Sequence, residues 1–127
     1  MSTTTDILVI EDDPIMREAV AEWLRGAGYG VRMADDGDAG LACVSTAPPA
    51  LVVTDVHMPG TSGAFVIAQL KQRHPEIPII AISGLFSSGF GMNADDIVAL
   101  GASCALAKPF KRNQLLGAVA QLLSNCA

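Results

Sequence analysis

The sequence predicts an α/β protein in which helices cover both faces of a five-stranded parallel sheet. Several short apolar blocks, such as residues 7–10, 51–54 and 79–82, have the continuous hydrophobic character of strands that are buried on both faces. Helical patterns separate these blocks, and parallel strands need crossover connections of this kind. Right-handed crossovers would place the helices on both faces of the sheet.

The first two strands and the helix between them can be located from their flanking residues. The block 7–10 is the first strand, and Asp13 and Pro14 suit the cap and the first position of the helix that follows. Apolar residues then recur at helical spacing until Gly28, which favours a helix end. A less hydrophobic second strand is expected at 29–34, near an edge of the sheet.

The rest of the chain repeats this alternation, so the sequence contains five strand–helix units. Proline and glycine mark several of the helix ends. The expected elements are a helix over 38–47, a strand over 51–54, a loop over 58–63, a helix that ends before Pro75, a strand over 79–82, a helix from a cap on Asn93 to a stop at Gly101, a strand over 103–107 and an amphipathic helix around 115–123.

The length and composition fit one domain. The chain has 127 residues, half of them hydrophobic, which is enough for one core. No apolar block approaches the roughly 20 residues that a membrane span needs, and the N-terminus has no basic stretch followed by an apolar one. We therefore expect residues 1–127 to form a single domain with a core at about 6–124, without membrane association.

Charge and cysteine usage narrow the functional class. The net charge is −5, with 8 basic and 13 acidic residues, whereas nucleic-acid binding normally needs a basic face. Direct binding to nucleic acid is therefore not expected. Cys43, Cys104 and Cys126 are far apart and form no metal-binding pair, which favours reduced thiols in the cytoplasm. Cys43 and Cys104 are expected to be small core residues.

Polar residues that suit phosphate chemistry stand where four of the predicted strands end: Asp12, Asp55, Ser83 and Lys108. Because the carboxyl ends of parallel strands share one edge of a sheet, these side chains should converge. Oxygen ligands without nitrogen or sulfur suit a hard cation such as Mg²⁺. A carboxylate beside Mg²⁺, a hydroxyl and a lysine suits a transferred phosphoryl group.

These residues fall in four stretches that resemble the receiver domain of bacterial two-component response regulators. The stretches are ILVIEDDP from residue 7, DVHMPGTSG from residue 55, IIAISG from residue 79 and KPF from residue 108. Each alone is weak, but their order and spacing together are specific, and the resemblance covers about residues 6–124. It implies a flavodoxin-like receiver fold with strand order 2-1-3-4-5, which is known from flavodoxin and a chemotaxis regulator.

The resemblance implies a phosphoacceptor and a magnesium site. Asp55 matches the aspartate that attacks the phosphorus of a phosphohistidine on a partner kinase. Asp12 matches a direct Mg²⁺ ligand and Glu11 a ligand through water. The backbone carbonyl of His57 matches the remaining protein ligand, so the implied metal site consists of Glu11, Asp12, Asp55 and His57.

The resemblance also implies a cradle for the phosphoryl oxygens. Ser83 matches a hydroxyl donor, and Lys108 matches the lysine that pairs with the phosphoryl group. The backbone amides of His57 and Gly84 would complete this cradle. The bond between Lys108 and Pro109 is cis in the family, which an X–Pro bond allows.

Two departures from the family pattern concern how phosphorylation would be signalled to a partner protein. Ala105 stands where the family usually has an aromatic switch residue, and residues 84–93 form a longer, glycine-rich segment. One hypothesis is that Phe86 or Phe90 replaces the missing aromatic; the alternative is a variable surface loop. Leu85 cannot orient an attacking water, so at most modest autodephosphorylation is expected.

The preferred interpretation is a receiver that assists its own phosphorylation but is otherwise not an enzyme. Its partners would be a sensor histidine kinase or phosphotransfer protein and a downstream effector protein. One alternative is a receiver-like scaffold that works without phosphorylation, which Ala105 keeps open. Another is a Mg²⁺-dependent phosphatase, although His57 stands where such enzymes carry a second acid. The sequence leaves the oligomeric state open.

Overall fold

The structure, a computed structural model, describes residues 5–57, 62–84 and 94–125, in which strands and helices alternate as expected. The elements are β1 (Asp6–Ile10), α1 (Pro14–Gly26), β2 (Gly30–Ala34), α2 (Gly37–Thr46), β3 (Leu51–Asp55), α3 (Gly63–Arg73), β4 (Ile79–Ser83), α4 (Ala94–Leu100), β5 (Cys104–Ala107) and α5 (Arg112–Asn125). Their bounds differ from the predicted bounds by one or a few residues.

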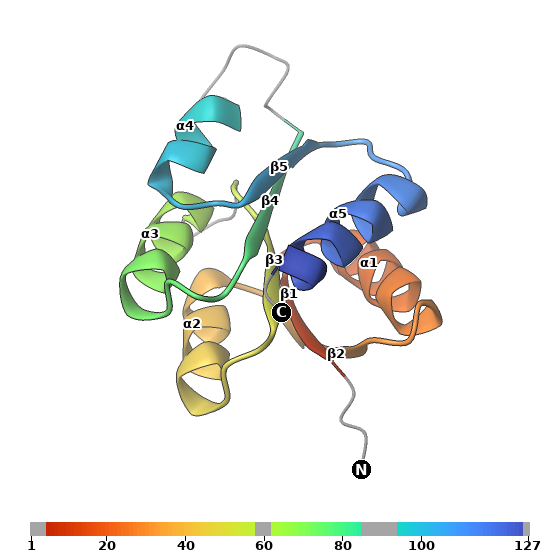
Figure 1. Cartoon of the computed structure of the whole chain (residues 1–127), viewed down its shortest axis with the longest axis horizontal. Helices are drawn as coiled ribbons and strands as arrows, with labels where there is room; N and C mark the ends of the chain where they lie inside the picture. Colours follow the sequence, from red (N-terminus) through yellow and green to blue (C-terminus); the bar gives the residue numbers. More distant parts are fainter. Residues whose placement is uncertain (1–4, 58–61, 85–93, 126–127) are drawn as a thin grey trace.

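The five strands form one parallel sheet in the order β2-β1-β3-β4-β5, which confirms the predicted topology (Figure 1). The weaker strand, β2, lies at one edge of the sheet as expected, and β5 lies at the other. The strands with continuous apolar runs, β1, β3 and β4, occupy the three central places. The carboxyl ends of β1 and β3 are therefore neighbours, and β4 follows β3.

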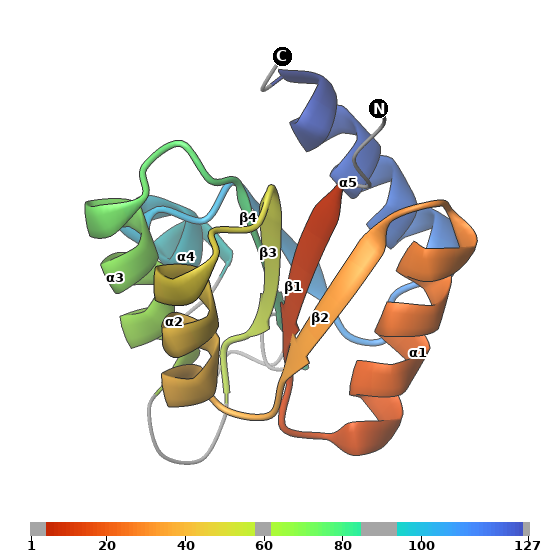
Figure 2. The same ribbon diagram turned by 90° about the horizontal axis from the view of Figure 1, so that it is seen from below.

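Helices cover both faces of the sheet, with α1 and α5 on one face and α2, α3 and α4 on the other (Figure 2). Alternate residues of β1 enter different halves of the core. Ile7 and Val9 pack in the cluster that includes residues of α1 and α5, whereas Leu8 and Ile10 pack in the cluster that includes residues of α2, α3 and α4. All four are fully buried. This two-sided burial explains why the strands are apolar without alternation.

The helix ends follow the local signals in the sequence. Asp13 caps α1 by accepting a hydrogen bond from the amide of Ile15 at 3.0 Å, and Pro14 is the first helical residue. Gly28 and Gly101 follow α1 and α4 with positive φ angles of 98° and 132°, a conformation that glycine adopts without strain. One of the shifted bounds lies next to the strand that carries Asp55: the predicted loop over 58–63 includes Gly63, which is the first residue of α3.

The cysteines pack less deeply than predicted. Cys43 and Cys104 are half-buried at the margins of the two core clusters rather than inside them, and both are free thiols. The predicted cap Asn93 and the predictions on Leu85, Phe86 and Phe90 lie outside the described residues. No helix in the described ranges has the length and hydrophobicity required to cross a bilayer.

Candidate functional site

Three carboxylates meet at the carboxyl edge of the sheet. Glu11 and Asp12 directly follow β1, and Asp55 is the last residue of β3. One ligand oxygen from each lies within 4.8 Å of the others. Glu11 is fully buried and Asp55 is 4% exposed, whereas Asp12 is exposed. The structure thus brings together the three acids that the sequence predicted to share a site, and we call them the acidic cluster.

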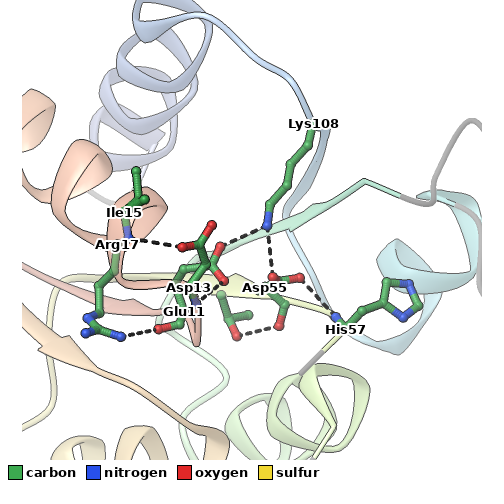
Figure 3. Close-up of polar contacts among 8 residues, drawn as sticks. Glu11, Asp13, Ile15, Arg17, Asp55, His57 and Lys108 are labelled. Carbon is green, nitrogen blue, oxygen red and sulfur yellow. Dashed lines mark hydrogen bonds and ion pairs between the residues drawn. The ribbon is translucent and has the colours of Figure 1, made fainter. Parts of the chain in front are cut away.

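Lys108 joins two members of the acidic cluster. Its Nζ atom donates hydrogen bonds of 3.0 Å to Glu11 Oε1 and 3.0 Å to Asp55 Oδ2 (Figure 3). The backbone amide of Lys108 also donates to the carbonyl of Ser83, which ties the segment after β5 to β4. The bond between Lys108 and Pro109 is cis, as the resemblance implied. One ammonium therefore lies between two buried carboxylates.

The electrostatics of the cluster follow from burial and crowding. Burial raises the pKa of Glu11 to about 7, and the neighbouring Asp55 adds to this rise, while the Lys108 ammonium opposes it. Burial alone would lower the pKa of Lys108, but its hydrogen bonds to Asp55 and Glu11 outweigh burial, so the pKa of Lys108 is raised. The lysine stays charged at neutral pH. Three carboxyl groups thus share one ammonium, an arrangement that favours a further cation.

The hydrogen bonds of Asp55 fix its side chain and backbone. Its Oδ1 atom accepts a hydrogen bond of 3.0 Å from the amide of His57 (Figure 3). The hydroxyl of Thr54 donates to the backbone carbonyl of Asp55 at 3.0 Å, and Thr54 is fully buried. The carboxylate therefore points into the cluster with one oxygen toward His57 and the other toward Lys108.

Gly63 packs against the backbone that carries Asp55. A Cβ atom at Gly63 would lie 2.5 Å from the Cα of Val56 and 2.9 Å from the carbonyl carbon of Asp55. The amide of Gly63 also donates to the carbonyl of Val56 at 3.0 Å. The first turn of α3 thus packs directly against the end of β3, and only glycine fits this approach. Sequence reasoning found Gly63 as part of a motif but did not identify this packing.

The turn that presents Glu11 and Asp12 is held from three sides. The amide of Glu11 donates to the carbonyl of Ala34 at the end of β2, 3.1 Å away. Arg17 Nη1 donates to the carbonyl of Glu11 at 2.9 Å, and the amide of Asp13 donates to Glu11 Oε2 at 3.2 Å (Figure 3). Sequence reasoning missed Arg17. Its only signal was a basic residue early in a helix that follows an acidic pair.

The remaining predicted residues lie at or near the same edge. Ser83 is fully buried at the end of β4, where the preceding residue Ile82 pairs with Asp55. His57 is exposed and contributes its amide to Asp55, and the role of its carbonyl stays a prediction. Ala105 is half-buried in β5 opposite Ala81 of β4. The position of Ser83 is compatible with its predicted role as a hydroxyl donor, which stays a prediction.

Comparisons with known proteins agree with this architecture. The transcriptional regulatory protein FixJ of Bradyrhizobium diazoefficiens is 35% identical over 115 residues, which cover 91% of this chain and 55% of FixJ. The transcriptional regulatory protein BaeR of Escherichia coli is 27% identical over 97% of this chain and 50% of BaeR. The chain thus spans about half the length of these relatives.

Solved structures match over nearly the whole chain. The receiver domain of NtrX from Brucella abortus has a TM-score of 0.85 at 32% identity and covers 94% of this chain and 98% of that domain. The chemotaxis response regulator CheY4 of Vibrio cholerae has a TM-score of 0.84 at 27% identity, over 94% of this chain and 99% of CheY4. The profile of the response regulator receiver domain family matches residues 7–120. The chain therefore belongs to the response regulator receiver domain family of two-component systems.

Proposed function

We propose that this chain is a phosphoacceptor receiver in which Asp55 takes a phosphoryl group from a phosphohistidine in a Mg²⁺-dependent reaction. The observation that carries the proposal is the placement of Lys108 Nζ 3.0 Å from both Glu11 and Asp55. A buried carboxylate beside further acids and one lysine is suited to receive a charged phosphoryl group once a cation offsets the repulsion.

The proposed transfer assigns a role to each residue of the site. One carboxylate oxygen of Asp55 attacks phosphorus, so that an O–P bond forms while the P–N bond of the phosphohistidine breaks. The leaving imidazole keeps the electron pair of that bond. Lys108 releases its contact with the Asp55 oxygen and pairs with the phosphoryl oxygens. The Ser83 hydroxyl and the amides of His57 and Gly84 donate to the remaining oxygens.

The donor set of the acidic cluster fits Mg²⁺, because all its ligand atoms are carboxylate oxygens that lie within 4.8 Å of one another. Glu11, Asp12 and Asp55 would hold the ion together with the carbonyl of His57. When bound, Mg²⁺ would neutralise the carboxylates and the phosphoryl oxygens. The chain's own contribution is to fix the backbone of Glu11 and Asp55, as their hydrogen bonds indicate.

The family membership frames the partners. Receiver domains are signalling proteins rather than classical enzymes, and response regulators act with histidine kinases and downstream effectors. We assign this chain a sensor histidine kinase or a phosphotransfer protein as donor and an effector protein as target. Residues 1–127 would act as one receiver module in the cytoplasm.

The proposal is tested by incubation with acetyl phosphate and Mg²⁺, with intact-protein mass spectrometry as the readout. The expected result is one phosphoryl group per chain, absent in Asp55→Asn and in the presence of a chelator. Asp38→Asn is a matched control, because Asp38 is an exposed acid at the start of α2. An unlabelled wild-type protein would refute the proposal in favour of a scaffold. Continuous release of phosphate would favour a phosphatase.

A further inference from the structure

Arg17 is a basic residue in an unfavourable place for its charge. It is the fourth residue of α1, where the helix dipole presents its positive end. Among the described residues Arg17 forms no ion pair, although two members of the acidic cluster, Glu11 and Asp12, lie just before the same helix. Because a positive charge near a helix N-terminus is unfavourable, another interaction of the Arg17 guanidinium must offset this repulsion.

The hydrogen bond from Arg17 supplies that interaction. Arg17 Nη1 donates to the backbone carbonyl of Glu11 at 2.9 Å, and the Arg17 side chain is half-buried (Figure 3). A hydrogen bond from an ionised donor is stronger than one between neutral groups. The guanidinium thus crosses from the first turn of α1 to the last backbone unit before Asp12.

The Glu11 carbonyl controls the direction in which Asp12 leaves the sheet. That carbonyl and the amide of Asp12 belong to one planar peptide unit, so fixing the oxygen fixes the plane. The amide of Glu11 is held by the carbonyl of Ala34, which is 3.1 Å away. With Arg17 on the other side, the backbone before Asp12 is fixed by both β2 and α1.

Asp12 depends on this backbone because its side chain is exposed. Glu11 and Asp55 are each held by Lys108, and Asp55 also by the amide of His57. No hydrogen bond from the described residues holds the Asp12 carboxylate. The position of its oxygens therefore depends on the orientation of the peptide unit that precedes it.

We infer that Arg17 is a positioning residue of the cation site: it orients the Glu11–Asp12 peptide so that the Asp12 carboxylate meets the other two acids. This inference rests on the proposed function, because it assumes that the acidic cluster binds a divalent cation. It makes a prediction opposite in sign to that of simple electrostatics. The charge of Arg17 repels a cation, so its removal alone would tighten binding, whereas lost positioning weakens binding.

The test is the equilibrium dissociation constant of MgCl₂, measured by titration calorimetry at constant ionic strength without any phosphoryl donor. Positioning predicts that Arg17→Met raises the Kd about tenfold, the lower end of the effect of residues that orient metal ligands. Arg17→Lys, which retains a donor, should recover part of the affinity. Arg25→Met is the matched control, since it removes the same charge from the exposed last turn of α1.

Each outcome has a defined meaning. Unchanged or tighter binding in Arg17→Met overturns the inference while leaving the proposed function intact. A wild-type protein that neither binds Mg²⁺ nor becomes labelled on Asp55 overturns both. Thermal unfolding without metal checks that each variant is folded at the titration temperature, and Arg17→Lys keeps the test valid if Arg17→Met does not fold. A rise in Kd for Arg17→Met beyond that for Arg25→Met supports the inference.

Discussion

Substitution of Glu11 by glutamine should remove a pH dependence from the stability of the metal-free protein. The folded structure raises the pKa of Glu11 from 4.5 to about 7, chiefly through burial and with a contribution from Asp55. Folded protein therefore binds this proton more tightly than unfolded protein does. The stabilisation is fully present below pH 4.5 and is lost as the pH rises through 7.

The magnitude follows from the size of this change. Since one pH unit corresponds to about 1.4 kcal/mol, a pKa that rises from 4.5 to about 7 corresponds to about 3 kcal/mol of unfolding free energy. Most of this difference falls between pH 5 and pH 8. The full burial of Glu11 supports an effect of this order, because solvent screens its carboxylate little.

The assay is urea denaturation in a chelating buffer at several pH values between 5 and 8. Wild type should lose stability across this range by about 2–3 kcal/mol more than Glu11→Gln. Glu22→Gln serves as the control, because Glu22 is an exposed acid of α1. If wild type and Glu11→Gln have parallel profiles, the reasoning about burial and crowding is refuted. Saturating Mg²⁺ should diminish the difference, because a bound cation requires the ionised carboxylate.

Three further predictions follow from contacts around the site and at the opposite end of the sheet. Gly63→Ala should destabilise the fold by roughly 1–3 kcal/mol and slow labelling of Asp55, since the added Cβ would overlap Val56. The control is Gly117→Ala, where nothing lies within 4 Å of the added atom, so this variant should gain about 1 kcal/mol of stability. If urea denaturation gave both variants the same change in stability, this account would be contradicted. Lys108→Met should bind Mg²⁺ several-fold more tightly in calorimetry but become phosphorylated more slowly, because the ammonium competes for Glu11 and Asp55; weaker Mg²⁺ binding would count against this account. Arg32→Met should lower the free energy of unfolding by about 1–2 kcal/mol, because Arg32 donates to Asp6 and to the end of α2. Labelling of Asp55 should not change, and slower labelling would show that Arg32 is coupled to the site.

The sequence alone was sufficient to locate the strands and helices, because their signals are local and periodic. Strands buried on both faces must be apolar at every position, so blocks such as 7–10 and 79–82 are distinct from amphipathic helices. Topology then places strand ends at one edge, and Glu11, Asp12 and Asp55 meet there as predicted. The order of the strands came from a family resemblance, because periodicity does not encode which strands are neighbours.

Tertiary structure alone decided how the site is held together. The sequence predicted that Lys108 would converge with Asp55, but not which atoms would meet, because the two residues are 53 positions apart. The carbonyl contact of Arg17 and the close packing of Gly63 depend on how helices dock beside strand ends, within tenths of an ångström. The hydrophobic pattern specifies which faces of strands and helices are buried, but the distances between polar atoms are determined only when the sheet and both helix layers are packed together. For that reason the convergence of the acids and Lys108 was predictable, whereas the bridge from Lys108 to both Glu11 and Asp55 and the supporting residues were visible only in the folded chain.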